Sequence, residues 1–395
     1  ELLARPEHRL RVARILEPLY DGDKLWKDLI VVLRAQCEVA AGHQEVEMLA
    51  RIADLEELQL QQPRAAFETW LAAFQAAPGE PRPRVAVTRL ATALSRWADA
   101  AAAYEVALGA VDSTDVALRG QLLGELGDIH DVHLGDGERA IAAFRRLLEL
   151  DPGNSETAHR AGVALARLYE AGGDWTALIG ILRRQADWTD SPTERKRLLV
   201  QVADIQEVAL GSTDAAIGAW RDVLAEDGED VGALAALERL FGGAERYREL
   251  VEILRRRVDG ARDPQEAKVQ LRRIAELEEV FLEDPGEAIS AHLEILDHLP
   301  DDGETLAELT RLYRAAGRFA DLLETLERRL ATTAPRTERD GLTFEIATLL
   351  ATSLGRRAEA LERFAQVLQG PATGPVRAGS LVAVEAMLDD DELRL

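Results

Sequence analysis

The segment His130-Asp131-Val132-His133 holds the residues best suited to binding a metal ion. On a helix its two imidazoles occupy positions i and i+3 of one face, and Asp128 stands close by in sequence. Histidines at helical spacing do bind metals, but a zinc site needs three or four ligands. The chain has 7 histidines, and no other lies near this pair in sequence. We therefore expect no metal and no other cofactor.

Other patterns that would indicate catalysis are missing from the sequence. It has no glycine-rich phosphate loop, no cysteine pair at zinc spacing and no nucleophile elbow. Carboxylates are common in a chain of net charge −24, so pairs of them do not indicate acid–base catalysis. Cys37 follows Val32 and Leu33 on an expected helix, which favours a small core residue over a nucleophile. The sequence predicts no catalytic residue.

Composition and charge limit the class of partner. Apolar residues make up 47% and charged residues 30% of the 395 residues, which allows a continuous core in a soluble chain. The net charge of −24 disfavours nucleic-acid partners, because contacts to phosphates need a basic surface. No apolar run approaches the roughly 20 residues that span a bilayer, and the single cysteine cannot form an internal disulfide. We expect no nucleic acid, no membrane span and a cytoplasmic location.

An internal repeat indicates the elements that must position these residues. Trp175, Tyr247 and Phe319 each follow an Arg-Leu-aromatic triplet and lie 72 residues apart, from 175 to 247 and from 247 to 319. A second series of apolar pairs interleaves with the first: Phe67 with Trp70, Ile141 with Phe144, Ile217 with Trp220, Ile289 with His292 and Leu361 with Phe364. Apolar residues at i, i+3, i+4 and i+7 around both series indicate amphipathic helices, and we find no strand signal. The repeating unit is therefore a doublet of two helical hairpins.

We expect a single array over residues 1–395, with about ten hairpins in five doublets. The doublets span 8–80, 81–154, 155–229, 230–301 and 302–375, with partial units at 1–7 and 376–395. The first residues resemble the tail of a preceding hairpin and lack the layout of a signal peptide. Residues 377–388 resemble the first helix of a further unit. A longer parent protein, open at both ends of this array, is the expectation.

The hairpins resemble tetratricopeptide repeats. Leu126-Gly127, then Ala140-Ile141 with Phe144, then residues 147–154 follow the signature of that family nearly residue by residue. The small Gly127 would let two helices approach closely, and Phe144 would fill the space beside it. This resemblance implies an all-α, right-handed solenoid of antiparallel helical hairpins that binds proteins or peptides in its concave groove.

The sequence also departs from the family pattern. The second hairpin of each doublet has 13 residues between its two small residues, as from Ala203 to Ala216, one more than the family norm. The tryptophans at repeat positions are predicted to lie in the core. They are Trp26, Trp70, Trp97, Trp175 and Trp220.

In this family the first helix of each hairpin lines the groove, and the residue after the small residue points into it. By this resemblance, first hairpins place arginines in the groove, and second hairpins place acids there and again one turn later. The arginines are Arg89, Arg167, Arg239 and Arg311; the acids are Asp54, Asp128, Asp204 and Glu276, followed by Glu57, Asp131, Glu207 and Glu279.

Two interpretations of this alternation remain open. In the first, each arginine pairs with acids of neighbouring hairpins, as Arg239 would between Asp204 and Glu276. Exposed pairs of this kind contribute about 0.2–1 kcal/mol each. In the second, the groove recognises a polar, mostly basic segment through surplus acids such as Glu207 and Glu279. The two are compatible, because a ladder of pairs could leave some acids free.

The sequence favours an interaction scaffold that binds a partner protein or peptide, with a basic segment as one candidate. Alternatives are a structural component that self-associates through its open ends, a toroidal glycosidase with groove carboxylates as acid and base, and an RNA-binding helical repeat. Continuing repeats at both ends argue against a closed toroid. The acidic charge argues against RNA. We expect no enzymatic activity.

Overall fold

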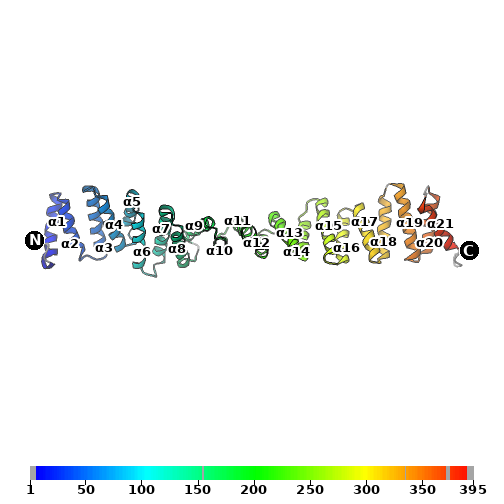
Figure 1. Cartoon of the computed structure of the whole chain (residues 1–395), viewed down its shortest axis with the longest axis horizontal. Helices are drawn as coiled ribbons and strands as arrows, with labels where there is room; N and C mark the ends of the chain where they lie inside the picture. The colour runs from blue at the N-terminus through cyan, green and yellow to red at the C-terminus, as the bar shows by residue number, and fades with distance from the viewer. Residues whose placement is uncertain (1–5, 154, 334, 371–373, 389–395) are drawn as a thin grey trace. The chain divides into compact units, whose positions relative to one another are not determined.

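The computed structural model describes residues 6–153, 155–333, 335–370 and 374–388, and helices are its only regular secondary structure. The chain divides into two compact units, Glu1–Leu210 and Gly211–Leu395, which we call unit 1 and unit 2. Within each unit, consecutive helices pack against each other in pairs (Figure 1). This confirms the all-helical architecture of paired helices. None of the described helices is long and apolar enough to cross a membrane.

In unit 1, each odd-numbered helix up to α9 opens a hairpin and the next even-numbered helix closes it. The elements are α1 (Pro6–Gly22), α2 (Trp26–Cys37), α3 (His43–Asp54), η2 (Leu55–Gln59), α4 (Pro63–Ala76), α5 (Pro81–Leu94), α6 (Trp97–Ala110), α7 (Val116–Asp128), η3 (Ile129–Leu134), α8 (Gly137–Leu150), α9 (Glu156–Gly172), α10 (Trp175–Trp188), α11 (Pro192–Asp204) and η4 (Ile205–Ala209), where η marks a π-helical turn. Pro6 already belongs to α1, so that helix starts before the boundary predicted at residue 8, and residues 1–5 lie outside the described residues.

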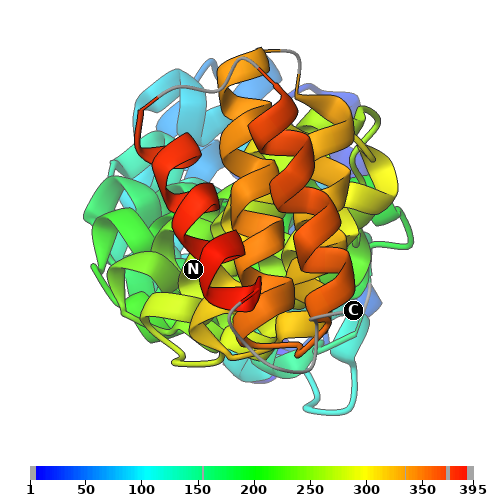
Figure 2. The same cartoon turned by 90° about the vertical axis from the view of Figure 1, so that its right-hand side faces the viewer.

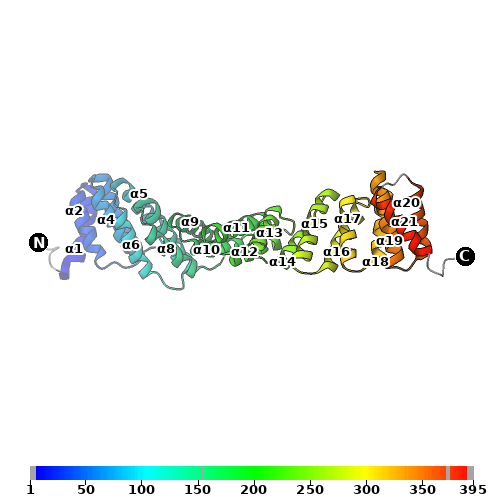
Figure 3. The same cartoon turned by 45° about the vertical axis from the view of Figure 1, so that its right-hand side comes forward.

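Unit 2 continues the same numbering. Its helices are α12 (Thr213–Glu226), α13 (Val231–Gly243), α14 (Tyr247–Asp259), α15 (Pro264–Val280), α16 (Pro285–His298), α17 (Gly303–Ala315), α18 (Phe319–Thr332), α19 (Arg336–Thr352), α20 (Arg357–Gln369) and α21 (Pro375–Leu388). Figure 2 shows α19, α20 and α21 side by side, and Figure 3 shows the pairs of unit 2 from another direction. The doublet boundaries and the single-array organisation stay predictions.

Side chains cap the starts of α11 and α15. Ser191 accepts a hydrogen bond from the backbone N–H of Glu194 at 3.4 Å, and Pro192 is the first residue of α11. Asp263 likewise accepts from the N–H of Gln265 at 3.0 Å before α15. A side-chain acceptor at this position satisfies a backbone donor that the helix itself leaves free.

The hairpin loops have one backbone feature in common, a residue with positive φ, which the sequence does not reveal. Within the described residues, every hairpin loop inside a unit contains a residue with positive φ: Lys24, Gln61, Ser95, Gly135 and Gly173 in unit 1, and Glu245, Glu283, Gly317 and Gly355 in unit 2. In the loop at Glu245, the next residue, Arg246, donates its N–H to the carbonyl oxygen of Phe241 at 2.9 Å, which closes the helix end. Glycine marks only some of these turns.

The extra residue of the second hairpins has a structural counterpart in unit 1. A π-helical turn follows α3, α7 and α11, at η2, η3 and η4. A π-helical turn accommodates one residue more than an α-helical turn. Unit 2 differs, because α15 stays α-helical to Val280.

The core follows the repeat pattern, with one correction. Gly127 of α7 lies so close to α8 that a Cβ there would come within 2.4 Å of the Phe144 ring. Trp70 and Trp220 are buried, as predicted, at 2% and 7% exposure. Three other tryptophans, Trp26, Trp97 and Trp175, are only half-buried. Each of the three is the first residue of its helix, so none is fully enclosed as predicted, although Trp26 packs against the core cluster that contains Leu29 and Ile52.

Candidate functional site

The predicted groove residues all lie on odd-numbered helices or on the π-helical turns that continue them. We call the surface that they mark the odd-helix face. In unit 1 it comprises Asp54, Glu57, Arg89, Asp128, Asp131, Arg167, Asp204 and Glu207. In unit 2 it comprises Arg239, Glu276, Glu279 and Arg311.

Arginines on this face pair with the second series of acids. Both guanidinium nitrogens of Arg89 donate to the Glu57 carboxylate, at 2.5 and 2.7 Å. In unit 2, Arg311 holds Glu279 in the same two-pronged way, at 2.7 and 2.6 Å. Each pair links two successive hairpins of one unit. Hydrogen bonds from Arg311 lower the pKa of the Glu279 carboxyl, so this acid stays ionised.

These observed pairs correct both interpretations of the alternating charges, which differ in the acids that they leave free. Glu57, Asp131 and Glu279 are not surplus acids, because Arg89, Arg167 and Arg311 pair with them. The physical reason is the length of the arginine side chain. It extends past the first acid, which follows the small residue, and meets the second acid one helical turn later. Arg239 and Glu207 also have interaction partners.

Two further arginines complete the pairing in unit 1. Arg82 pairs with Asp54 at 2.5 Å, and Arg160 pairs with Asp128 at 2.9 Å. Burial raises the pKa of Asp128, which Arg160 partly offsets. Neither arginine was among the predicted groove residues, although each stands two helical turns before a groove arginine and therefore shares its face. Such half-exposed pairs contribute about 0.2–1 kcal/mol each.

Two predicted site residues have carboxylates that are unpaired among the described residues. Within the described part of the chain, neither Asp204 nor Glu276 has a hydrogen bond or ion pair to another side chain, and both are exposed. Although Asp204 is exposed overall, partial desolvation of its carboxyl by the neighbouring protein, followed by the nearby charge of Glu207, raises its pKa. Free acceptors on an otherwise self-paired face are the positions where a partner can add a bond.

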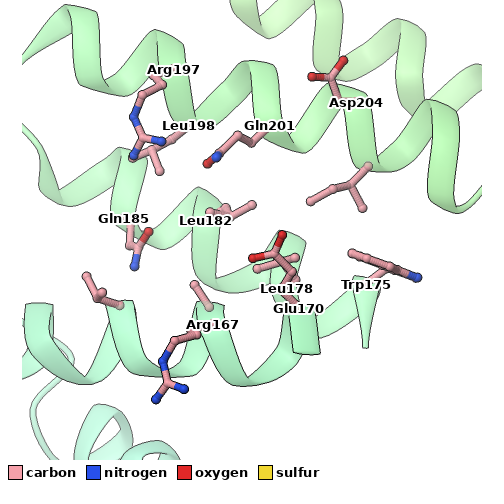
Figure 4. A pocket seen from close by; sticks show the side chains of 13 residues that line it. Arg167, Glu170, Trp175, Leu178, Leu182, Gln185, Arg197, Leu198, Gln201 and Asp204 are labelled. Atoms are coloured by element: carbon pink, nitrogen blue, oxygen red, sulfur yellow. The ribbon is translucent and has the colours of Figure 1, made fainter. Parts of the chain in front are cut away.

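Asp204 borders a pocket that we call pocket 1, of about 370 Å³, between α9, α10 and α11. Its floor is apolar and includes Trp175, Leu178, Leu182, Leu198 and Ile205. Figure 4 shows these leucines between the helices, with Arg167 and Asp204 at opposite edges. The side-chain nitrogen of Gln185, which also lines pocket 1, is buried without a partner in the described residues. Pocket 1 thus combines apolar area with open polar groups.

Exposed apolar residues accompany the acids of the odd-helix face in unit 1. Leu58, Val132 and Val208 are 63%, 70% and 81% exposed. Each directly follows an acid of the second series and lies on a π-helical turn. Their spacing in the sequence indicates that they share this face, although only charged residues were predicted to lie on it. The face therefore offers apolar contacts between neutralised charges.

A second pocket lies in unit 2, between α15, α16 and α17, with a volume of about 570 Å³. We call it pocket 2. Glu276, Glu279 and Arg311 line it, together with His292 of α16. Asp204 and Glu276, the two open acids, thus border one pocket each.

The histidine segment of unit 1 does not form a converging ligand set. His133 stacks on Trp97 with ring centroids 3.7 Å apart, and Asp131 pairs with Arg167. His130 is buried, which lowers its pKa. Among the described residues, no group of three or more His, Cys, Asp or Glu side chains is placed to hold a metal. Burial raises the pKa of the Cys37 thiol, which disfavours the reactive thiolate.

Helices in consecutive packed pairs, with one shared turn per hairpin, define a helical-repeat protein. The model of the tetratricopeptide-repeat family matches residues 163–196 and 305–340 of the chain. The first match covers most of α9 and α10, next to pocket 1. The resemblance inferred from the sequence is confirmed at these two places, while the 72-residue doublet stays a prediction.

Solved structures with a similar arrangement number 258 chains. One is the Naa15/Naa10 complex bound to HypK-THB, at 12% identity and a TM-score of 0.32, covering 95% of this chain and 60% of that one. Another is the MamA protein, at 17% identity and a TM-score of 0.26, covering 46% of this chain and 100% of that one. This chain therefore spans 60% of the length of the first. No curated protein sequence matches it.

Proposed function

We propose that this chain is a protein-interaction scaffold that binds a segment of a partner protein on the odd-helix face of unit 1. Pocket 1 is the observation that carries the proposal, because its apolar floor lies beside the unpaired carboxylate of Asp204. Small binding sites are typically apolar concavities with a few polar groups that fix orientation. The match to the tetratricopeptide-repeat family supports a role in protein interaction in general.

The geometry also narrows the chemistry of the partner. A mostly basic segment would need many open acids, whereas Asp54, Glu57, Asp128 and Asp131 already pair with arginines. Leu58, Val132 and Val208 add exposed apolar area to the same face. The partner segment is therefore amphipathic. An apolar side chain enters pocket 1, and a hydrogen-bond donor or cation beside it meets Asp204.

We place this role in binding and not in catalysis or nucleic-acid recognition. Among the described residues of this face, Arg89, Arg167 and Arg311 each pair with a carboxylate and are therefore not free to bind phosphates. The net charge of −24 adds repulsion against a phosphate backbone.

Partner capture with pocket variants tests this proposal. Trp175→Ala removes an aromatic wall of pocket 1, and we expect the affinity for the captured partner to fall at least about tenfold, as at interface hot spots. Asp204→Asn keeps the shape and removes the charge, so we expect a smaller loss. The measurement is partner capture from an extract of the source organism, followed by titration of the captured partner.

Trp97→Ala is the matched control. Trp97 is also half-buried at the first residue of its helix, but it stacks on His133 and lies outside pocket 1. All variants must keep the helical circular dichroism of the wild type. Equal binding by wild type and Trp175→Ala, or equal losses in Trp175→Ala and Trp97→Ala, would count against pocket 1 as the site.

A further inference from the structure

Pocket 2 exists where the repeat pattern changes one residue. His292 occupies the position at which other second hairpins carry a larger aromatic residue: Trp70, Phe144, Trp220 and Phe364. Those aromatic side chains are buried and fill their hairpins. The imidazole is smaller and polar, and the space beside it is the cavity of about 570 Å³. That volume falls within the range of about 300–1,000 Å³ that is typical of ligand sites.

His292 is a buried polar group without a partner. Its side chain is 6% exposed, and its Nδ1 atom has no hydrogen-bond partner among the described residues. Buried polar atoms are nearly always paired, so an unpaired one beside a cavity indicates a missing partner. Burial lowers the pKa of this imidazole, which is therefore neutral at pH 7. A neutral imidazole offers one acceptor and one donor nitrogen.

The cations around pocket 2 are already engaged. Arg311 pairs with Glu279 and Glu308, Arg272 pairs with Glu304, and Arg273 pairs with Glu238. An anionic ligand would have to compete for these arginines. Glu276 is the acid of the pocket that has no such pair within the described chain. The unpaired carboxylate of Glu276 is therefore the group of pocket 2 that can accept hydrogen bonds from a ligand.

The rim of pocket 2 adds apolar surface. Val269 and Val280 belong to α15, as does Glu276, and their side chains are 63% and 60% exposed. Long basic side chains place their methylene stems on such surface while the charged end meets an acid or water. Apolar walls beside one open carboxylate thus match a long cation better than a compact one.

We propose that pocket 2 binds a lysine or arginine side chain of a protein segment, with its cation on Glu276 near His292 and its stem against Val280. This inference rests on the proposed role in protein binding, but it concerns a different pocket in the other unit. Pocket 1 takes an apolar side chain, whereas pocket 2 takes a cationic one. The two pockets then bind different kinds of side chain.

Binding of short peptides to the full chain, followed by NMR of labelled valine methyl groups, tests the proposal. The probe is a blocked Gly-Ser-Lys-Ser-Gly peptide, compared with versions that carry acetylated lysine or glutamate in place of the lysine. We expect the lysine peptide to shift the Val269 and Val280 signals saturably. The acetylated and glutamate versions should need at least about tenfold higher concentrations, because loss of a charged hydrogen bond weakens binding by that order.

Two variants assign the effect to the pocket. Glu276→Gln should abolish the preference for lysine, and His292→Phe should weaken binding, because it replaces the imidazole nitrogen near the cation with an apolar ring. Glu266→Gln is the matched control, because Glu266 is an exposed acid on the same helix but does not line the pocket. It should leave binding unchanged.

The proposal is overturned if the lysine peptide gives no saturable shifts, if acetylated lysine binds equally well, or if Glu276→Gln keeps the preference. Those results would leave the role of pocket 1 intact, because Trp175→Ala tests that pocket separately in the partner assay. Conversely, loss of the pocket 1 function would leave the peptide titration of pocket 2 unaffected.

Discussion

Replacing Phe144 by alanine is expected to lower the free energy of unfolding of unit 1 by about 3–5 kcal/mol, the usual cost of deleting a buried ring. The ring is 2% exposed and rests on Gly127, where no side chain could move in to fill the space. The close approach of α7 and α8 is built around this contact, so the cavity cannot collapse easily. Urea unfolding followed by helical circular dichroism measures the loss.

Leu134→Ala is the control for this prediction. Leu134 lies in the same hairpin, on η3, but is 37% exposed, so its truncation should cost much less. Equal losses from the two variants would show that the Gly127–Phe144 contact does not hold the hairpin together.

His292→Phe is expected to raise the free energy of unfolding by about 1–3 kcal/mol, the desolvation penalty that an unpaired buried polar group carries. Phenylalanine already occupies the equivalent position at Phe144 and Phe364, where it is buried at 2% and 1% exposure. The variant should also remove the unpaired nitrogen beside pocket 2 without disturbing the fold. The midpoint of urea unfolding at pH 7.5 gives the change, and a lower midpoint than wild type would contradict it.

The same variant is expected to change the pH dependence of stability. Burial lowers the pKa of folded His292 below 6.5, the value for an unperturbed imidazole. As the pH falls below 6.5, the unfolded chain therefore takes up this proton before the folded chain does, and the wild type loses stability. His292→Phe removes this contribution, so the stability gained over wild type should grow as the pH falls.

Charged groups from both neighbouring helices face this imidazole: Glu308 and Arg311 from α17, and Arg272 and Glu279 from α15. Their opposing effects leave burial as the dominant cause of the lowered pKa. His298→Phe is the control, because His298 ends the same helix but is exposed. If both variants show the same pH dependence, the buried imidazole is not its source.

Helix periodicity and caps were predictable because they are local. The paired Gly127 and Phe144 could also be recognised, since close helix packing needs a small residue opposite a large one. The turns at Lys24 and Glu245 could not, because neither residue carries the glycine signal for positive φ. Their geometry is imposed by the pairing of helices, which a local pattern does not contain.

The sequence was enough to predict which face carries the candidate site, but not which side chains contact each other there. Alternating charges placed Arg89 and Glu57 on the same surface, yet which acid each arginine reaches depends on side-chain length and helix offset. The half-buried position of Trp175 depends on its place at the first turn of α10, where it borders pocket 1. Pocket 2 could be suspected from His292 alone, as the odd member of an aromatic series.

The most direct measurement of the central claim is site-specific photo-crosslinking in an extract of the source organism. A photo-reactive residue replaces Val163, which is 65% exposed on α9 beside pocket 1, or Val106, which is 57% exposed on the even-numbered helix α6. If the odd-helix face of unit 1 binds the partner, the same partner protein crosslinks from position 163 and not from position 106. Crosslinking from position 106 with none from position 163 would contradict the account.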